Sequence, residues 1–217
     1  MLQARGLSCI YGSHRVYADV CVDLHPGEFV VLTGSNGIGK SSFLRTLAGW
    51  QPPTSGEVVF SDEADRPRDL QDRCRLIFVP DTPDFYDELT LHEHLAFVSG
   101  VNHLVGWRSR AEQLMESLLL SSSSDDYPFV LSRGMRQKFA LALALLVSPQ
   151  YMLLDEPFGP LDAQARQVVW DLLRTYCDGG GSVLMSSHAR PVEGSADCYI
   201  SLTDESLMDR VSSTDDA

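Results

Sequence analysis

A glycine-rich segment, Gly34-Ser35-Asn36-Gly37-Ile38-Gly39-Lys40-Ser41, follows a compact apolar run and precedes a stretch of helical character. It matches the pattern G-x-x-x-x-G-K-[ST] at every position. Glycines let the backbone wrap around an anion, and the helix that follows adds the positive end of its dipole. We expect Lys40 to reach the β- and γ-phosphates of a nucleotide and the Ser41 hydroxyl to coordinate Mg²⁺, with Ser42 in the same site. The pattern therefore predicts a phosphate-binding loop rather than an ordinary glycine-rich turn.

The segments on either side of this loop predict an α/β fold. Apolar residues 29–32 are typical of a buried strand, and residues 41–50 have the character of a helix. Further strands are expected at 7–11, 16–24, 56–60, 75–79, 151–154 and 183–186, and helices within 90–120, 131–147 and 168–176. Residues 62–72 are expected to form a charged surface loop. Alternating strands and helices favour a mainly parallel sheet, which binds ligands at the carboxyl ends of its strands.

The predicted organisation is one domain over residues 1–202 with a phosphate-loop NTPase core. It carries an N-terminal antiparallel β subdomain and an inserted helical subdomain at about 84–147. In residues 203–217 acidic residues outnumber the single Arg210, and we expect this segment to be a solvated, flexible tail.

Two acids end the predicted strand 151–154. Asp155 is placed to hold Mg²⁺, directly or through water, as in other phosphate-loop ATPases. Glu156 can polarise the attacking water as a general base. Taken alone, such a pair would be read as a solvated strand end; next to a phosphate loop it predicts a site for nucleotide hydrolysis.

Composition narrows the choice of partners. The 217 residues have a formal net charge of −13, which disfavours a nucleic-acid binder because such proteins neutralise phosphates with Lys and Arg. The five cysteines form no Cys-x-x-Cys pair, as expected for reduced cytosolic thiols. The longest uncharged run, residues 139–154, is shorter than the about twenty residues of a membrane span and contains Pro149. We expect no nucleic-acid binding and no membrane-spanning segment.

A third motif, Leu131-Ser132-Arg133-Gly134-Met135-Arg136-Gln137, precedes an apolar helical stretch. It resembles the Leu-Ser-Gly-Gly signature of ATP-binding-cassette (ABC) proteins, with Arg133 in place of the first glycine. The resemblance extends over roughly residues 2–200. It implies that Ser132 and the Gly134 N–H, at a helix start, face ATP bound to another copy. A serine N-cap without a ligand is the alternative reading of Ser132.

The same resemblance implies roles for three more residues. Tyr11 takes the place of the aromatic residue that stacks on adenine, although a tyrosine on a strand edge is the alternative. Asp162 ends the segment Gly159-Pro160-Leu161-Asp162, which resembles the loop that links the two nucleotide sites in the family. His188 resembles the histidine that contacts the γ-phosphate. The catalytic residues expected are therefore Lys40, Glu156 and His188.

Two positions depart from the family pattern. Asp81 stands where the family has a glutamine that touches Mg²⁺, and its carboxylate remains a hard oxygen ligand. The expected metal ligands are therefore Ser41, Asp81 and Asp155. Arg133, Asp81 and the run 83–90 resemble ABC exporters of the second bacterial type.

Residues 92–94 (His-Glu-His) are not expected to bind a metal, because side chains at positions i and i+2 of a helix point in different directions. A solvated helix face is predicted instead.

The resemblance implies an Mg²⁺-dependent ATPase. One signature per chain implies a homodimer that closes around two ATP molecules and drives separate membrane-spanning permease subunits, for export in this branch. The chain would then lie in the cytoplasm on the inner face of the membrane, with residues 81–90 docking a partner helix. An ABC ATPase that couples hydrolysis to assembly or regulation of a partner complex is the alternative, and a non-hydrolysing regulatory cassette is a third.

Overall fold

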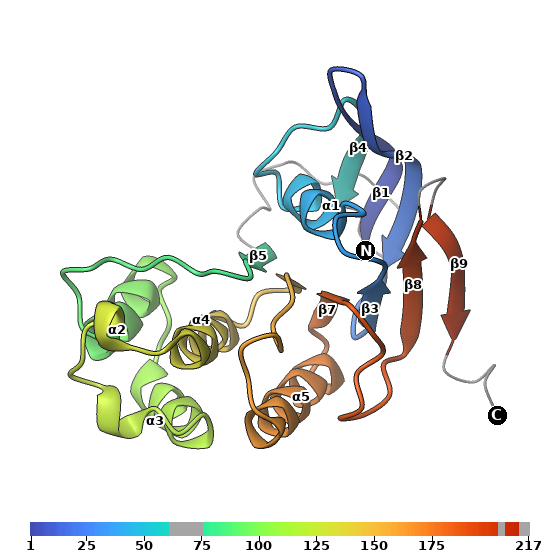
Figure 1. Ribbon diagram of the computed structural model, residues 1–217. Coiled ribbons are helices and arrows are strands. Elements are labelled where there is room, and N and C mark those ends of the chain that lie inside the picture. The colour runs from blue at the N-terminus through green and yellow to red at the C-terminus, as the bar shows by residue number, and fades with distance from the viewer. Residues whose placement is uncertain (61–75, 204–206, 213–217) are drawn as a thin grey trace.

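The computed structural model describes residues 1–60, 76–203 and 207–212, and it contains two sheets and a helical lobe (Figure 1). The smaller sheet is antiparallel, in the order β2-β1-β4. Its strands are β1 (Leu2–Tyr11), β2 (His14–Leu24) and β4 (Ser55–Phe60). The larger sheet has the order β5-β6-β7-β3-β8-β9; it is parallel from β5 to β8 and antiparallel between β8 and β9. Its strands are β3 (Phe29–Thr33), β5 (Leu76–Val79), β6 (Tyr151–Leu154), β7 (Ser182–Ser187), β8 (Cys198–Leu202) and β9 (Leu207–Ser212).

The helices divide between the core and the lobe. The core helices are α1 (Lys40–Leu47) and α5 (Ala163–Asp178). The lobe contains α2 (Leu91–Val101), α3 (Trp107–Ser117), the short 3-10 helices Ser121–Ser123 and Pro128–Val130, and α4 (Arg133–Val147). Figure 1 shows α2, α3 and α4 gathered on one side of the molecule, away from the antiparallel sheet. We call this group, residues 91–147, the helical lobe.

Apolar runs fill both faces of the parallel sheet because successive side chains of a strand point to opposite faces. Phe29 and Val31 of β3 pack with the helical lobe and α5, whereas Val30 and Leu32 pack with α1 and the antiparallel sheet. All four are fully buried, and burying one such side chain contributes about 1.5–3 kcal/mol. The parallel sheet is thus clamped between two hydrophobic cores, which holds its carboxyl ends in place.

The predicted α/β fold is confirmed, with shifts at element ends. The first core helix ends at Leu47 rather than residue 50, since Gly49 has a φ of 72°. The helical segment 90–120 is two helices, separated by a turn in which Gly106 also has positive φ. The helix expected at 168–176 begins at Ala163, where Asp162 caps it. The predicted charged loop 62–72 lies outside the described residues.

The C-terminal segment contains one strand that the sequence analysis did not expect, while flexibility of the tail as a whole stays a prediction. Leu207–Ser212 forms β9, which pairs antiparallel with β8 at the edge of the sheet. An edge strand presents unpaired backbone N–H and C=O groups, and the next segment of chain can satisfy them by folding back. The charge of the tail, on which the prediction rested, says nothing about this backbone pairing.

His94 is buried, which corrects the expectation of a solvated face at this residue, whereas His92 and Glu93 are exposed as expected. The His94 side chain is 3% exposed. The backbone N–H of Tyr86 donates to its Nε2 at 3.1 Å, so Nδ1 carries the proton and donates to Thr90 O at 2.8 Å. Glu93 completes a capping box with Thr90 at the start of α2. These residues hold the loop before α2 against the helix, a tertiary role that spacing along the chain does not reveal.

Within the described part of the chain, no helix has both the length and the apolar character needed to span a bilayer.

Candidate functional site

A pocket of about 590 Å³ opens at the carboxyl end of the parallel sheet, where the sequence places the phosphate loop. The loop and the start of α1 form one side of it, and the segments after β5, β6 and β7 form the other. It is lined by His14, Val16, Asn36, Gly37, Gly39, Lys40, Ser41, Ser42, Asp81, Arg133, Glu156, Gly159 and His188. Nine of the residues predicted from sequence therefore meet around one cavity.

Glycine is required at two positions of the phosphate loop. Gly34 and Gly39 have φ angles of 154° and 107°. A Cβ atom at Gly34 would lie 2.8 Å from Leu202 O, and one at Gly39 would lie 2.5 Å from a methyl group of Val16. Ile38 N–H closes the turn on Ser35 O at 3.4 Å. The loop thus packs tightly against β2 and β8, which fixes the direction in which its backbone N–H groups point.

Lys40 is the buried cation of the pocket. Its side chain is 6% exposed, and its Nζ donates to Gly34 O at 2.8 Å and to Ser35 O at 3.2 Å. The same nitrogen lies 3.6 Å from Oε1 of Glu156. The ammonium is therefore held at the mouth of its own loop, where the predicted phosphates would meet it.

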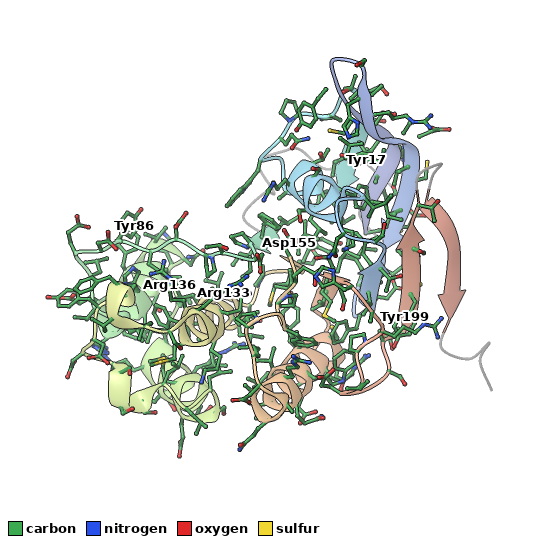
Figure 2. The ribbon with its side chains drawn as sticks, viewed as in Figure 1. Tyr17, Tyr86, Arg133, Arg136, Asp155 and Tyr199 are labelled. Atoms are coloured by element: carbon green, nitrogen blue, oxygen red, sulfur yellow. The ribbon has the colours of Figure 1, made fainter. Side chains whose placement is uncertain are left out.

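Asp155 is joined to the phosphate loop by a short hydrogen-bond chain. Ser41 Oγ donates to Asp155 Oδ1 at 3.0 Å, and Ser186 Oγ donates to the same oxygen at 2.8 Å. The Asp155 side chain is buried and directly follows β6, and Figure 2 shows it where the core meets the helical lobe. Ser186 also accepts from the Glu156 N–H at 2.9 Å, so it orients both acids. Ser186 was missed from the sequence, although it stands in the Ser186-Ser187-His188 run that predicted His188.

Glu156 lies between the side chains of Lys40 and His188. Its Oε1 is buried and accepts no hydrogen bond from the described residues, but Lys40 Nζ lies at 3.6 Å and His188 Nδ1 at 3.3 Å. Burial raises the pKa of Glu156 above its usual range, while His188 and Lys40 oppose that shift. Its backbone φ is 47°, an uncommon value for a residue other than glycine. A raised carboxyl pKa suits a group that must take up a proton.

Asp81 and Arg133, the two departures from the family pattern, contact each other. Arg133 Nη2 donates to Asp81 Oδ1 at 2.8 Å and to Oδ2 at 3.0 Å. Asp81 follows β5 in the core, and Arg133 is the first residue of α4 in the helical lobe. Figure 2 shows Arg133 on the edge of the lobe that faces the core. The pair spans the boundary between the two parts of the molecule.

Three other predicted residues start helices outside this pocket. Ser132 Oγ accepts from Met135 N–H at 3.3 Å, and Asp162 Oδ1 accepts from Ala165 N–H at 2.8 Å, so both are N-caps. A Cβ atom at Gly134 would lie 2.9 Å from Pro160 O. The starts of α4 and α5 are thus packed together. A role for Ser132, Gly134 and Asp162 toward a second copy stays a prediction.

Tyr11 does not line the pocket; it ends β1 and is 56% exposed. His14, which pairs with it across the β1–β2 turn, and Val16 line the pocket instead. Neither was predicted, and the hairpin spacing around Gly12 was the signal that could have found them. Stacking of Tyr11 on adenine stays a prediction.

The residues present fit a magnesium–nucleotide complex. The serine hydroxyl of residue 41 and the carboxylates of Asp81 and Asp155 are hard oxygen ligands of the kind that Mg²⁺ prefers. The buried Lys40 ammonium and the loop N–H groups are donors suited to phosphate oxygens.

Comparison with known proteins agrees with this geometry. Residues 17–159 match the family described as ABC transporter. The sulfate/thiosulfate import ATP-binding protein CysA of Mesorhizobium japonicum is 37% identical over 169 residues, which cover 75% of this chain and 49% of that protein. The chain thus spans about half the length of that curated relative. An uncharacterized ABC transporter ATP-binding protein of Bacillus subtilis, YthP, is 31% identical over 80% of this chain and 70% of its own length.

Solved structures are similar over almost the whole chain. An ATP-binding subunit of an ABC transporter superposes with a TM-score of 0.88 at 28% identity, covering 99% of this chain and 91% of that one. The dimeric structure of MJ0796, a bacterial ABC transporter cassette, gives a TM-score of 0.82 at 25% identity and covers 98% of each chain. Since the family match extends over more than half of the residues and includes the phosphate loop, Asp155 and Glu156, the chain belongs to the ABC transporter family as one of its ATP-binding cassettes.

Proposed function

We propose that this chain is the Mg²⁺-dependent ATP-hydrolysing subunit of a transporter whose membrane-spanning part is a separate polypeptide. One observation carries the proposal: Lys40, Ser41 and Glu156 line a single pocket, where Lys40 Nζ lies 3.6 Å from Glu156 and Ser41 Oγ donates to the buried Asp155 at 3.0 Å. A cation for phosphates, ligands for Mg²⁺ and a carboxylate with raised pKa are the groups that ATP hydrolysis requires.

Each residue then has a separate task. Ser41 and Asp155, with Asp81, would hold Mg²⁺, which would supply positive charge to the phosphate oxygens. Lys40 moves its charge from Glu156 to the phosphates when these enter. Glu156 then loses a neutralising neighbour, which favours proton uptake at Oε1 from the attacking water. His188 Nδ1, on the other side of Oε1, keeps the carboxylate oriented.

Dimerisation of two identical chains is the second part of the proposal. Ser132 and Gly134 stand at the start of α4, a positive helix end, outside the pocket of their own chain. A two-fold dimer would bring these donors to the ATP of the other copy. The similarity to a cassette solved as a dimer supports this arrangement.

An apolar groove supports the third part, docking of the membrane partner. The groove has a volume of about 830 Å³ and lies between β5 and the helices α2 and α4. Trp50, Tyr86 and Phe97 line it and are 66%, 58% and 48% exposed. Large exposed aromatic side chains around an apolar hollow mark an interaction site, and a helix is the shape that such a groove accepts. We propose a helix from the cytoplasmic side of the permease as its occupant, which places the chain on the inner face of the membrane.

The direction of transport stays a prediction. Asp81, Arg133 and the run 83–90 favour export through their resemblance to exporters of the second bacterial type. The comparisons do not support this branch, because the Mesorhizobium japonicum relative is named as an import protein. Purification with the native permease, followed by transport assays in vesicles with ATP on one side, decides it: accumulation on the side opposite ATP supports export, and accumulation on the ATP side contradicts it.

Hydrolysis is tested with Glu156→Gln, which keeps the shape of the side chain and removes the base. We expect ATP turnover to fall at least about a hundredfold, near 2.7 kcal/mol of barrier, while an ATP-bound dimer accumulates in size-exclusion chromatography. Wild-type turnover in the variant would rule out the general-base role. No turnover in the wild-type protein with its permease would instead favour a regulatory cassette.

A further inference from the structure

The Asp81–Arg133 pair joins the core to the helical lobe inside the nucleotide pocket. One guanidinium nitrogen of Arg133 donates to both carboxylate oxygens of Asp81, at 2.8 and 3.0 Å. Both residues line the same pocket as Lys40 and Ser41. The carboxylate expected to serve Mg²⁺ is therefore already engaged by a cation of the same chain.

A guanidinium and Mg²⁺ compete for this carboxylate. Asp81 has two oxygens, and Nη2 of Arg133 uses both. A divalent cation at Asp81 would lie within a few ångströms of the Arg133 charge, and like charges at that separation repel strongly in a partly enclosed site. Direct ligation of Mg²⁺ by Asp81 thus favours release of Arg133.

The Asp81–Arg133 pair is weak enough for a bound ligand to open it. The side chains of Arg133 and Asp81 are 62% and 42% exposed. Exposed ion pairs of this kind contribute little, so a bound ligand can break them. Arg136, one turn further along α4, binds Pro83 O at 3.0 Å and Pro128 O at 3.1 Å. These contacts keep the segment after Asp81 on the lobe, so opening the outer pair need not detach that segment from α4.

We propose that Arg133 is a positioning residue that occupies Asp81 when no nucleotide is bound and yields it to Mg²⁺ when Mg²⁺–ATP enters. The inference rests on the proposed function, because it assumes that the pocket takes Mg²⁺–ATP. It makes the two unusual residues a matched set: Arg133 pairs with the carboxylate at 81 in the nucleotide-free protein, and Mg²⁺ replaces it there. The link between the core and the helical lobe then depends on whether Mg²⁺ is bound.

The test is an equilibrium binding experiment with the non-hydrolysable ATP analogue AMPPNP. Its dissociation constant is measured by calorimetry in EDTA and in excess Mg²⁺, and the ratio of the two values is the magnesium enhancement. For Arg133→Gln we expect the enhancement to rise about three- to fivefold, because Mg²⁺ no longer displaces a guanidinium. Arg133→Lys, which restores a cation, should return the enhancement toward the wild-type value.

The Asp81→Asn background separates this effect from a general change of charge. In that background Arg133→Gln should leave the enhancement unchanged, since there is no carboxylate to release. An equal rise in both backgrounds, or an equal rise for Arg108→Gln on the exposed surface of α3, would mean that only net charge matters and would overturn the proposal. An unchanged enhancement in Arg133→Gln would also overturn it. Absence of AMPPNP binding in the wild-type protein would instead contradict the proposed function itself.

Discussion

Glu156 illustrates how one side chain is prepared for proton transfer by its surroundings. Glu156 follows the end of β6 and has a positive φ. Its side chain is 16% exposed and lines the pocket. Burial raises its pKa, and the neighbouring His188 and Lys40 side chains limit the rise. Lys40 also donates to two loop carbonyls, so its contact with Glu156 can be exchanged for phosphate contacts.

The raised pKa of Glu156 predicts a pH-dependent stability. A carboxyl whose pKa is higher in the folded protein than in the unfolded chain favours folding at low pH, and this contribution is lost as pH rises through the folded-state pKa. Glu156→Gln should therefore unfold at a higher temperature than wild type at pH 8. The difference should shrink as the pH falls toward about 4. Thermal unfolding followed by circular dichroism over this range measures it.

Glu93 is the matched control because its shift has the opposite sign. Its pKa is lowered by the hydrogen bond from the Thr90 backbone in the capping box. Glu93→Gln should therefore lower the unfolding temperature at pH 8, with an effect that also fades toward acid pH. The same sign for both variants at pH 8 would contradict the assigned environment of Glu156.

At the start of α4, close contact with the loop before α5 determines which residue fits, and helix propensity does not. Gly134 lies in the first turn of the helix, where alanine would stabilise the isolated helix by about 0.8–1.0 kcal/mol. A Cβ atom there would meet Pro160 O at 2.9 Å, so the loop before α5 would have to move. Backbone contact therefore opposes helix propensity at this residue, and it joins the signature segment to residues 159–162.

Gly134→Ala is expected to destabilise the protein. Overpacking against a backbone atom costs about 1–3 kcal/mol, which exceeds the gain in helix propensity and leaves a net loss of about 1 kcal/mol. Gly100→Ala in α2 is the control, because a Cβ atom at Gly100 meets nothing within 4 Å and should raise stability by up to about 1 kcal/mol. Urea unfolding of both variants measures the change in the free energy of unfolding, which should be negative for Gly134→Ala and positive for Gly100→Ala. A stabilised Gly134→Ala would show that the loop yields without cost.

At the scale of the whole molecule, the nucleotide pocket and the apolar groove share one segment of chain, residues 81–86. Asp81 lines the nucleotide pocket, while Asp84, Phe85 and Tyr86 line the apolar groove. Arg136 lies over the ring of Phe85 at 5.2 Å and binds Pro83 O, so α4 holds this segment from the lobe side. In Figure 2, Tyr86 stands at the outer part of the lobe and Arg136 lies between it and Arg133. A partner in the groove would therefore contact the residues that follow Asp81.

Phe97→Ser is expected to weaken the complex with the permease. Phe97 is 48% exposed in the groove and packs edge-on against Tyr86 at 5.6 Å, so its loss removes apolar contact area from the docking surface. We expect at least about a tenfold loss of copurified permease, equivalent to 1.4 kcal/mol. Val105→Ser, fully exposed in the same lobe but outside the groove, is the control and should keep the permease. Equal recovery with both variants would contradict docking in the groove.

Local chemistry along the chain was sufficient to predict the fold class and most of the nucleotide pocket. The phosphate loop and the Asp155–Glu156 pair each lie within a few consecutive residues, and the apolar runs around them match the period of strands and helices. The carboxyl ends of parallel strands lie along one edge of the sheet, so a parallel sheet brings the phosphate loop and the Asp155–Glu156 pair close together. The resemblance to ABC proteins added His188, which the structure brings to Glu156.

Other features depended on contacts between residues far apart in the sequence. Arg133 lies 52 positions from Asp81, and Ser186 lies 31 positions from Asp155, so neither contact has a local pattern. Burial of His94, pairing of β9 with β8 and the apolar groove likewise depend on which surfaces meet when the lobe and core pack. Periodicity reports whether a residue faces inward, whereas only the folded chain brings a particular partner within hydrogen-bonding distance. The phosphate loop and the Asp155–Glu156 pair thus specify most of the proposed ATP-binding site, and tertiary packing joins its two unusual residues, Asp81 and Arg133, across the boundary between the core and the helical lobe.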